Sequence, residues 1–215
     1  MRKKIIFLIT GLLLGLGYIP TLMAEERPVL DKEYQQSFEI SYAKALNNKY
    51  DEAMAPLLKL IKKYPSDYVV NVRLGYLYYL KGDFKASVDY YEKGVHIKSK
   101  AVEPYQGILL PLMGRKDYKE SIKWGQMALK IDPLNYTVLS TVAYACYLNG
   151  DYKNATLYYL RLTELYPSDV TMHVGLAWSY LKTGDKIKAQ KEFIQVLNLS
   201  PTNQLAVTGY NLSKE

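Results

Sequence analysis

The chain has 215 residues, 49% of them hydrophobic, so it is long and apolar enough to bury a sizeable core. Without Arg2, Lys3 and Lys4 it holds 25 Lys and Arg against 21 Asp and Glu, a net charge of +4. So mild and evenly spread a charge argues against nucleic acid as a partner. With Cys146 as its one cysteine, the chain has no internal disulfide.

Residues 1–24 are typical of a secretory signal peptide. A basic start precedes an apolar run over residues 5–19, which Pro20 ends, and Ala24 provides a small residue at the expected cleavage point. Leu22 is bulky where a small residue is preferred, so an uncleaved anchor over residues 5–23 is the alternative. That run is short for a membrane span of about 20 residues. In either case we expect the rest of the chain to lie outside the cytoplasm.

A period of 34 residues runs through the rest of the sequence. Small residues recur at this step without slippage, at Ala53, Ser87, Ser121, Ala155 and Ala189. Four of them follow an aromatic residue by three positions, and four precede a proline by twelve. A fixed period of this length predicts an array in which each unit buries its apolar face against its neighbours.

Each unit is predicted to be a helix, a tight turn and a second helix. In the second unit, apolar residues recur at three- and four-residue steps on both sides of Gly82-Asp83. Prolines such as Pro65 and Pro167 end the second helices, because proline disfavours helix for the residue before it. We therefore divide the chain into a lead-in at 25–33, five repeats at 34–201, and a closing helix and tail at 202–215. The predicted buried side of that helix holds Leu205, Ala206 and Tyr210.

The pattern resembles the tetratricopeptide repeat family. That family asks for Leu-Gly, then Tyr, then a small residue, an aromatic residue and a late proline. The second unit supplies Leu74-Gly75, Tyr78, Ser87 and Tyr91. The resemblance covers about 34–201 and implies an all-α fold, a right-handed superhelical solenoid of five helix-turn-helix repeats plus the closing helix. It also implies that the first helices line a concave groove.

The third unit departs from the pattern. Pro111 falls inside its first helix, where proline costs roughly 3 kcal/mol and clashes with the carbonyl four residues back, at Gly107. Gly125 replaces the usual large residue, and Leu109 replaces the small one. Two interpretations are open: a degenerate middle repeat, or a kink that opens the groove for a partner.

The sequence holds no catalytic constellation, no cofactor motif and no metal-ligand spacing. Its two histidines, His96 and His173, lie far apart in the repeat array. Cys146 takes the position that Tyr78 and Tyr180 hold in their units, so we expect a small buried hydrophobe rather than a reactive thiol. The sequence therefore predicts a protein that is not an enzyme and that uses no cofactor or metal.

A second apolar face on the first helices predicts the binding site. Its 34-residue series runs through Tyr42, Tyr76, Leu110, Tyr144 and Trp178, away from core residues such as Leu74. Residues three or four apart share a helix face, and Tyr and Trp dominate binding hot spots. The alternative is that these rings only pack between repeats. The predicted binding residues are Phe38, Tyr42, Tyr76, Tyr79, Tyr144, Tyr147 and Trp178.

Some relatives hold a C-terminal carboxylate with a basic clamp, but of the corresponding residues only Arg73 is basic here. We predict a non-enzymatic scaffold or adaptor of the bacterial cell envelope, periplasmic or secreted, that binds a protein or peptide segment in an aromatic groove. The membrane is expected to be involved only through an uncleaved N-terminal segment. Two alternatives are open: carbohydrate binding, since planar rings suit sugar faces, and end-to-end self-association, against which the polar residues 213–215 argue mildly.

Overall fold

A computed structural model describes residues 31–215, which form eleven α-helices and no strand. The predicted signal peptide lies outside the described residues, as does most of the lead-in. No helix within residues 31–215 combines the length and the apolar character needed to cross a membrane. The helices are α1 (Lys32–Leu46), α2 (Tyr50–Lys63), α3 (Tyr68–Lys81), α4 (Phe84–Ile97), α5 (Val102–Gly114), α6 (Tyr118–Ile131), α7 (Tyr136–Leu148), α8 (Tyr152–Leu165), α9 (Val170–Lys182), α10 (Lys186–Leu199) and α11 (Gln204–Leu212).

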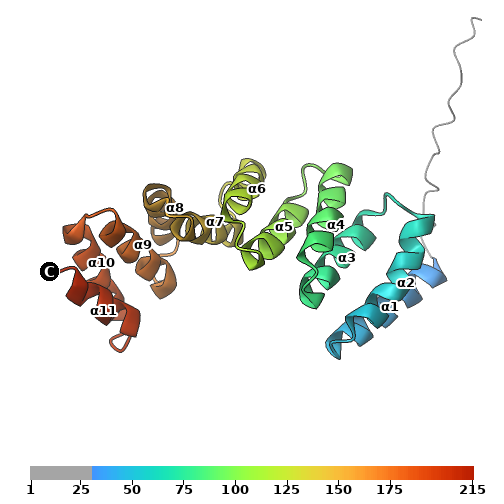
Figure 1. The fold of residues 1–215 in the computed structure, drawn as a ribbon, viewed down its shortest axis with the longest axis horizontal. Helices are drawn as coiled ribbons and strands as arrows, with labels where there is room; N and C mark the ends of the chain where they lie inside the picture. Colours follow the sequence, from blue (N-terminus) through green and yellow to red (C-terminus); the bar gives the residue numbers. More distant parts are fainter. Residues whose placement is uncertain (1–30) are drawn as a thin grey trace, which may run out of the picture.

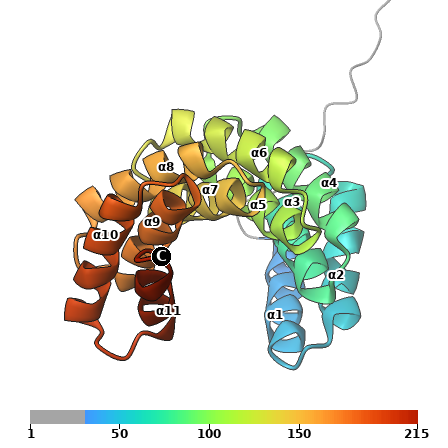
Figure 2. The same cartoon turned by 60° about the vertical axis from the view of Figure 1, so that its left-hand side comes forward.

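The helices follow one another along a curved array (Figure 1). Consecutive helices pack together, and from α3 onward each first helix also packs against the first helix of the next repeat. Turned by 60°, the array is an arch whose odd-numbered helices line the inner side (Figure 2). The predicted all-α solenoid of five helix pairs and a closing helix is confirmed.

Local sequence explains where the helices begin and where the pairs turn. Each repeat has one residue of positive φ in its turn, again at 34-residue steps: Asn48, Gly82, Lys116, Gly150 and Gly184. Carboxylate and amide side chains accept a hydrogen bond from a backbone N–H in the first turn of most helices, which stabilises their N-termini. These N-caps are Asp31, Asp67, Asp83, Asn135, Asp151, Asp169, Asp185 and Asn203.

The core lies between the two helices of each repeat and between neighbouring repeats. All five small residues of the 34-residue series are fully buried, and the Ser87 hydroxyl donates to the Gly75 carbonyl at 2.8 Å. Large rings from second helices lie against glycines of the following first helix. A Cβ added at Gly107 would lie 2.2 Å from the Tyr91 ring, and one at Gly175 would lie 2.4 Å from the Tyr159 ring.

The third repeat is continuous with the rest of the array. Helix α5 runs unbroken through Pro111 to Gly114, and the Arg115 N–H donates to the Pro111 carbonyl at 3.0 Å. Gly107 is small because the Tyr91 ring lies against it, a reason unrelated to the proline. A Cβ at Gly125 would lie 2.1 Å from Val142, so a side chain of the next repeat occupies the space of the missing large residue.

Candidate functional site

The predicted aromatic series lies on the inner helices and is largely open to solvent. Tyr42 is 54% exposed, Tyr76 39% and Tyr144 51%, whereas Trp178 is half-buried. Core residues of the same helices are fully buried, Leu74 at 0% among them. A helix that is apolar on both faces normally buries both. Tyr42, Tyr76 and Tyr144 are therefore exposed aromatic residues on first helices whose other face is buried.

Toward the N-terminus this surface forms a pocket of about 260 Å³, the N-terminal pocket. Arg73 lies within it, with its Cζ atom 4.2 Å from the Tyr42 ring centre and 5.7 Å from that of Tyr76. Its Nε donates to the buried Ser41 hydroxyl at 3.3 Å, which joins α3 to α1. The full lining is Phe38, Tyr42, Val69, Val72, Arg73, Tyr76, Tyr91 and Glu103.

The two charged residues of the N-terminal pocket, Arg73 and Glu103, do not form an ion pair with each other. Within the described residues, no carboxylate lies within ion-pairing distance of the Arg73 guanidinium. Burial lowers the pKa of Arg73, although an arginine stays protonated in proteins. Glu103 instead accepts a hydrogen bond from the Tyr68 hydroxyl at 2.9 Å. Burial, and then this hydrogen bond, raises the pKa of Tyr68. Arg73 is thus stabilised by two rings rather than by a counter-ion.

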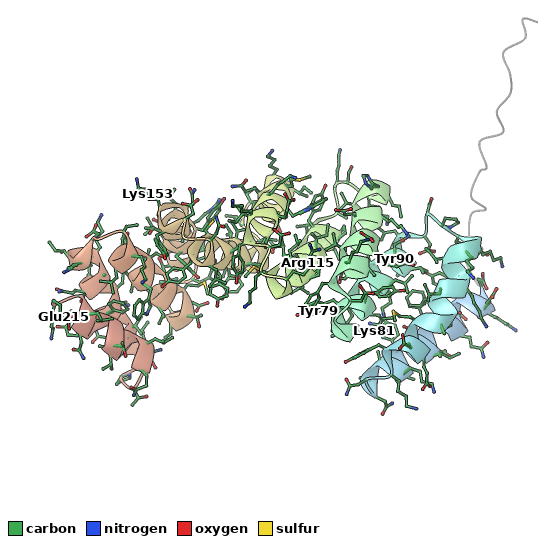
Figure 3. The ribbon with its side chains drawn as sticks, in the orientation of Figure 1. Tyr79, Lys81, Tyr90, Arg115, Lys153 and Glu215 are labelled. Atoms are coloured by element: carbon green, nitrogen blue, oxygen red, sulfur yellow. The ribbon has the colours of Figure 1, made fainter. Side chains whose placement is uncertain are left out.

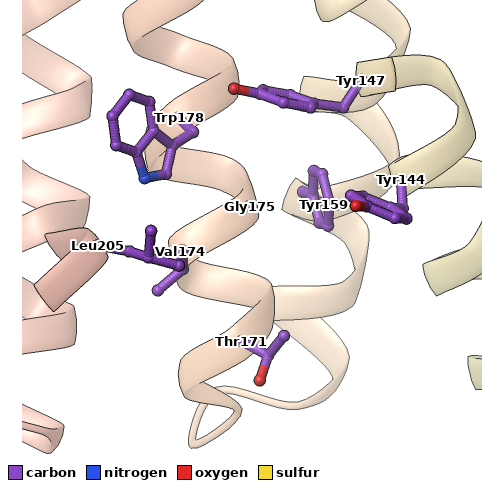
Figure 4. Close-up of a pocket in the computed structure, with 8 residues that line it drawn as sticks. All are labelled: Tyr144, Tyr147, Tyr159, Thr171, Val174, Gly175, Trp178 and Leu205. Carbon is purple, nitrogen blue, oxygen red and sulfur yellow. The ribbon is translucent and has the colours of Figure 1, made fainter. Parts of the chain in front are cut away.

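Toward the C-terminus lies a larger pocket of about 420 Å³, the C-terminal pocket. Four aromatic rings and a glycine surround it (Figure 4). Its lining holds no charged residue, and burial raises the pKa of Tyr159, which keeps that phenol neutral. The Trp178 ring packs edge to face against the Phe193 ring, with 5.7 Å between the ring centres. The full lining is Tyr144, Tyr147, Tyr159, Thr171, Val174, Gly175, Trp178 and Leu205.

Six of the seven predicted binding residues line these two pockets, and Tyr79 lines neither. Tyr79 lies near the turn between α3 and α4 (Figure 3), with its ring 6.0 Å from that of Phe84. The third repeat interrupts the aromatic series, because its members, Leu110 and Met113, carry no ring. Leu205 is 60% exposed at the rim of the C-terminal pocket, so its predicted place on the buried side of the closing helix was wrong.

Sequence reasoning missed the tyrosines that reach the groove from the second helices. Tyr91 lines the N-terminal pocket and Tyr159 the C-terminal pocket. Each passes beside a glycine sixteen residues later, Gly107 and Gly175, which leaves room for the ring. An aromatic residue on a second helix with a glycine sixteen residues later is a sequence pattern that could have predicted these two tyrosines.

Other chemistry has little support among the described residues. No cluster of three His, Cys, Asp or Glu side chains within residues 31–215 is close enough to hold a metal ion. Cys146 is 1% exposed, and burial raises the pKa of its thiol to about 12. A thiol with so high a pKa is a poor nucleophile at neutral pH.

Family models describing a tetratricopeptide repeat match residues 38–67, 68–100 and 170–203. A curated relative, tetratricopeptide repeat-containing protein trd-1 of Caenorhabditis elegans, is 23% identical over 185 residues, or 86% of this chain. The chain spans about a fifth, 22%, of the length of that relative. The chain is a tetratricopeptide repeat protein.

Solved structures place this tetratricopeptide repeat protein in the same fold. MamA from Desulfovibrio magneticus RS-1 superimposes with a TM-score of 0.72 at 15% identity, covering 81% of this chain and 98% of that one. YrrB, described as a TPR protein with an unusual peptide-binding site, gives 0.71 at 15% identity, covering 81% and 90%. The matched family ranges leave out residues 101–169, where α5 to α8 nevertheless continue the tetratricopeptide helix pairs.

Proposed function

We propose that this protein is a non-enzymatic scaffold that binds a segment of a partner protein along the inner face of its arch. The observation that carries the proposal is the exposure of Tyr42, Tyr76 and Tyr144, each at least 39%, on the side lined by first helices. Large rigid rings dominate the binding energy of protein interfaces, because they bury much area and lose little rotamer entropy.

A peptide segment fits this surface better than a compact ligand. The lining residues of the two pockets correspond across three repeats of the array, so one occupant of both pockets must be elongated. Backbone groups of an extended or helical segment would remain solvated while its side chains enter the pockets. The resemblance to YrrB, whose description names a peptide-binding site, supports the same class of ligand.

The test is selection of peptides from a random display library on the full-length protein, followed by binding measurements on variants. Tyr42→Ala and Tyr144→Ala are each expected to weaken the selected peptides about thirtyfold, corresponding to about 2 kcal/mol for a central aromatic. Tyr79→Ala is the matched control, because Tyr79 lies on a first helix but lines neither pocket. Peptides that bind all three variants equally would place the site elsewhere.

We further propose that the protein is exported and acts in a bacterial cell envelope. The support is the basic start, the apolar run over residues 5–19 and the small residue Ala24. Intact-mass spectrometry of the protein from its host should give a mature N-terminus at Glu25. Retention of residues 1–24 would instead indicate an uncleaved membrane anchor, with the rest of the chain still outside the cytoplasm.

A further inference from the structure

The two pockets are versions of one site, three repeats apart. Six of the eight residues that line the N-terminal pocket have a counterpart 102 residues later, three periods of 34, that lines the C-terminal pocket. The internal repeat therefore allows the two sites to be compared residue by residue. The pairs are Tyr42 and Tyr144, Val69 and Thr171, Val72 and Val174, Arg73 and Gly175, Tyr76 and Trp178, and Glu103 and Leu205.

In the N-terminal pocket a side chain of the protein itself, Arg73, occupies the space between two rings of the series. The Arg73 guanidinium lies by the faces of Tyr42 and Tyr76, at 4.2 and 5.7 Å from the ring centres. Cations are attracted to the negative face of an aromatic ring, and guanidinium groups also stack on such rings. The space between Tyr42 and Tyr76, two successive rings of the series, therefore accommodates a guanidinium group.

In the C-terminal pocket the position equivalent to Arg73 is a glycine, and the Tyr159 ring lies against it. Gly175 stands where Arg73 stands in the earlier repeat, between Tyr144 and Trp178 (Figure 4). The Tyr159 ring lies against Gly175, and Tyr147 also lines the pocket, so four rings surround an opening of about 420 Å³, against about 260 Å³ for the N-terminal pocket. None of the cation–π contacts recorded for the described residues involves these four rings.

The charge has changed together with the shape. The rim carboxylate Glu103 corresponds to Leu205, so the C-terminal pocket has lost the one acid and the one base of its counterpart. What remains is a neutral box of aromatic faces. Aromatic cages recognise cationic ligands such as quaternary ammonium groups through the attraction of the ring faces for positive charge.

We propose that the C-terminal pocket binds an arginine side chain of the partner segment, between Tyr144 and Trp178, as Arg73 lies between Tyr42 and Tyr76. The inference rests on the proposed function and gives it a specificity: the segment carries an arginine where it crosses α7 and α9. The guanidinium stacks on the faces of Tyr144 and Trp178, and its aliphatic stem contacts Val174 and Leu205.

The probe that tests this is N-acetyl-arginine N-methylamide, followed by NMR on the full-length protein. Saturable shifts are expected at the Tyr144 ring and the Trp178 indole. N-acetyl-citrulline N-methylamide has nearly the same shape without the charge, and it should bind at least about tenfold more weakly, corresponding to about 1.4 kcal/mol. The norleucine analogue separates a cation site from a simple apolar pocket.

Two variants locate the site. Tyr144→Ala removes a ring that is half exposed, so the protein should remain folded while probe binding falls at least about tenfold. The double variant Tyr159→Leu with Gly175→Arg recreates the first repeats, because Leu57 lies three repeats before Tyr159. Its arginine should fill the space, leaving the helical signal intact and abolishing probe binding. Tyr79→Ala is the control that should leave binding unchanged.

Several results would overturn the inference. Equal binding of citrulline or norleucine would show an apolar pocket, unchanged binding in Tyr144→Ala would place the probe elsewhere, and no binding would remove the site. In each case library peptides that still depend on Tyr42 or Tyr144 would leave the proposed function standing. Peptides independent of both tyrosines would end the two proposals together.

Discussion

The first two and the last two repeats share a helical plan and differ in what occupies the inner face. In the first pair, Arg73 extends from α3 across Tyr42 and joins α1 through Ser41. In the last pair, Gly175 takes the position of Arg73, and the Tyr159 ring of the second helix lies against that glycine. The period preserves the small residues at the helix contacts while the groove residues change.

Two coupled positions explain the difference. Where the second helix carries a ring, as at Tyr91, Tyr159 and Phe193, the residue sixteen later is glycine: Gly107, Gly175 and Gly209. Where it carries Leu57, the residue sixteen later is Arg73. A ring and a side chain on the next helix cannot occupy the same volume, so each repeat boundary has one or the other.

The largest effect that we expect tests this coupling. Gly175→Ala places a Cβ atom 2.4 Å from the Tyr159 ring, an overlap that should cost about 1–3 kcal/mol of unfolding free energy. Adding Tyr159→Leu should recover part of the loss, since the smaller residue vacates the space. Denaturant unfolding of the three proteins would measure both steps. Additive losses would show that the two positions are independent.

A smaller effect concerns hydrogen bonds between repeats. The first residue of the fourth repeat, Tyr136, donates its hydroxyl to Asp169 at 2.6 Å, and Tyr68 makes a similar bond to Glu103 at 2.9 Å. Tyr136→Phe should cost about 0.5–1.5 kcal/mol, because the carboxylate loses a donor. Thermal melts with Tyr68→Phe alongside would compare the two ends of the array. Equal stability of Tyr136→Phe and the wild type would contradict the assigned role.

The same bond predicts a pH dependence. The hydrogen bond to Asp169, with burial, raises the pKa of Tyr136 from 10.0 to about 12. A raised pKa means that the contribution is complete below pH 10 and is lost as pH rises through about 12. The stability difference between wild type and Tyr136→Phe should therefore shrink over that range. A constant difference would rule out this linkage.

Much of the fold could be predicted from the sequence, because the residues that set it are few and periodic. Ala155 and its equivalents are buried at the helix contacts, and prolines follow the second helices. The site was harder to predict, since pocket shape depends on contacts between helices. Packing across a repeat boundary brings Tyr159 beside Gly175 in the groove. It also places Leu205 of the closing helix at the rim of the C-terminal pocket. The spacing of residues within one helix shows which of them share a face, but it does not show which residues of other helices lie against that face.

A further test uses Arg73 directly. Arg73→Ala removes two ring contacts worth about 0.5–1 kcal/mol each at exposed sites, less the gain from no longer burying a cation. We expect a net loss of about 0.5–1 kcal/mol in denaturant unfolding. The vacated N-terminal pocket keeps Tyr42, Tyr76 and Glu103, so the N-acetyl-arginine probe should then bind at two sites instead of one. If Arg73→Ala still binds only one probe molecule per protein, the two pockets are not equivalent sites.

The smallest effect lies in the repeat that separates the pockets. Lys116 has a φ of 61° in the turn where Gly82 and Gly150 stand in their repeats. A left-handed conformation costs a residue with a side chain roughly 1–2 kcal/mol, whereas glycine adopts it freely but loses more entropy on folding. Lys116→Gly should therefore stabilise the protein by about 0.5 kcal/mol, raising the melting temperature by about 1–2 °C.

Asn48→Gly is the matched control for this turn. Asn48 has nearly the same φ, 58°, but asparagine adopts left-handed conformations more readily than lysine, so its replacement should gain less. Neither change touches a pocket, so probe binding should be unchanged in both. If Lys116→Gly stabilises the protein and leaves probe binding unchanged, the turn of the third repeat carries local backbone strain that does not affect the pockets. Altered binding would instead show that its geometry sets the relation between the two pockets.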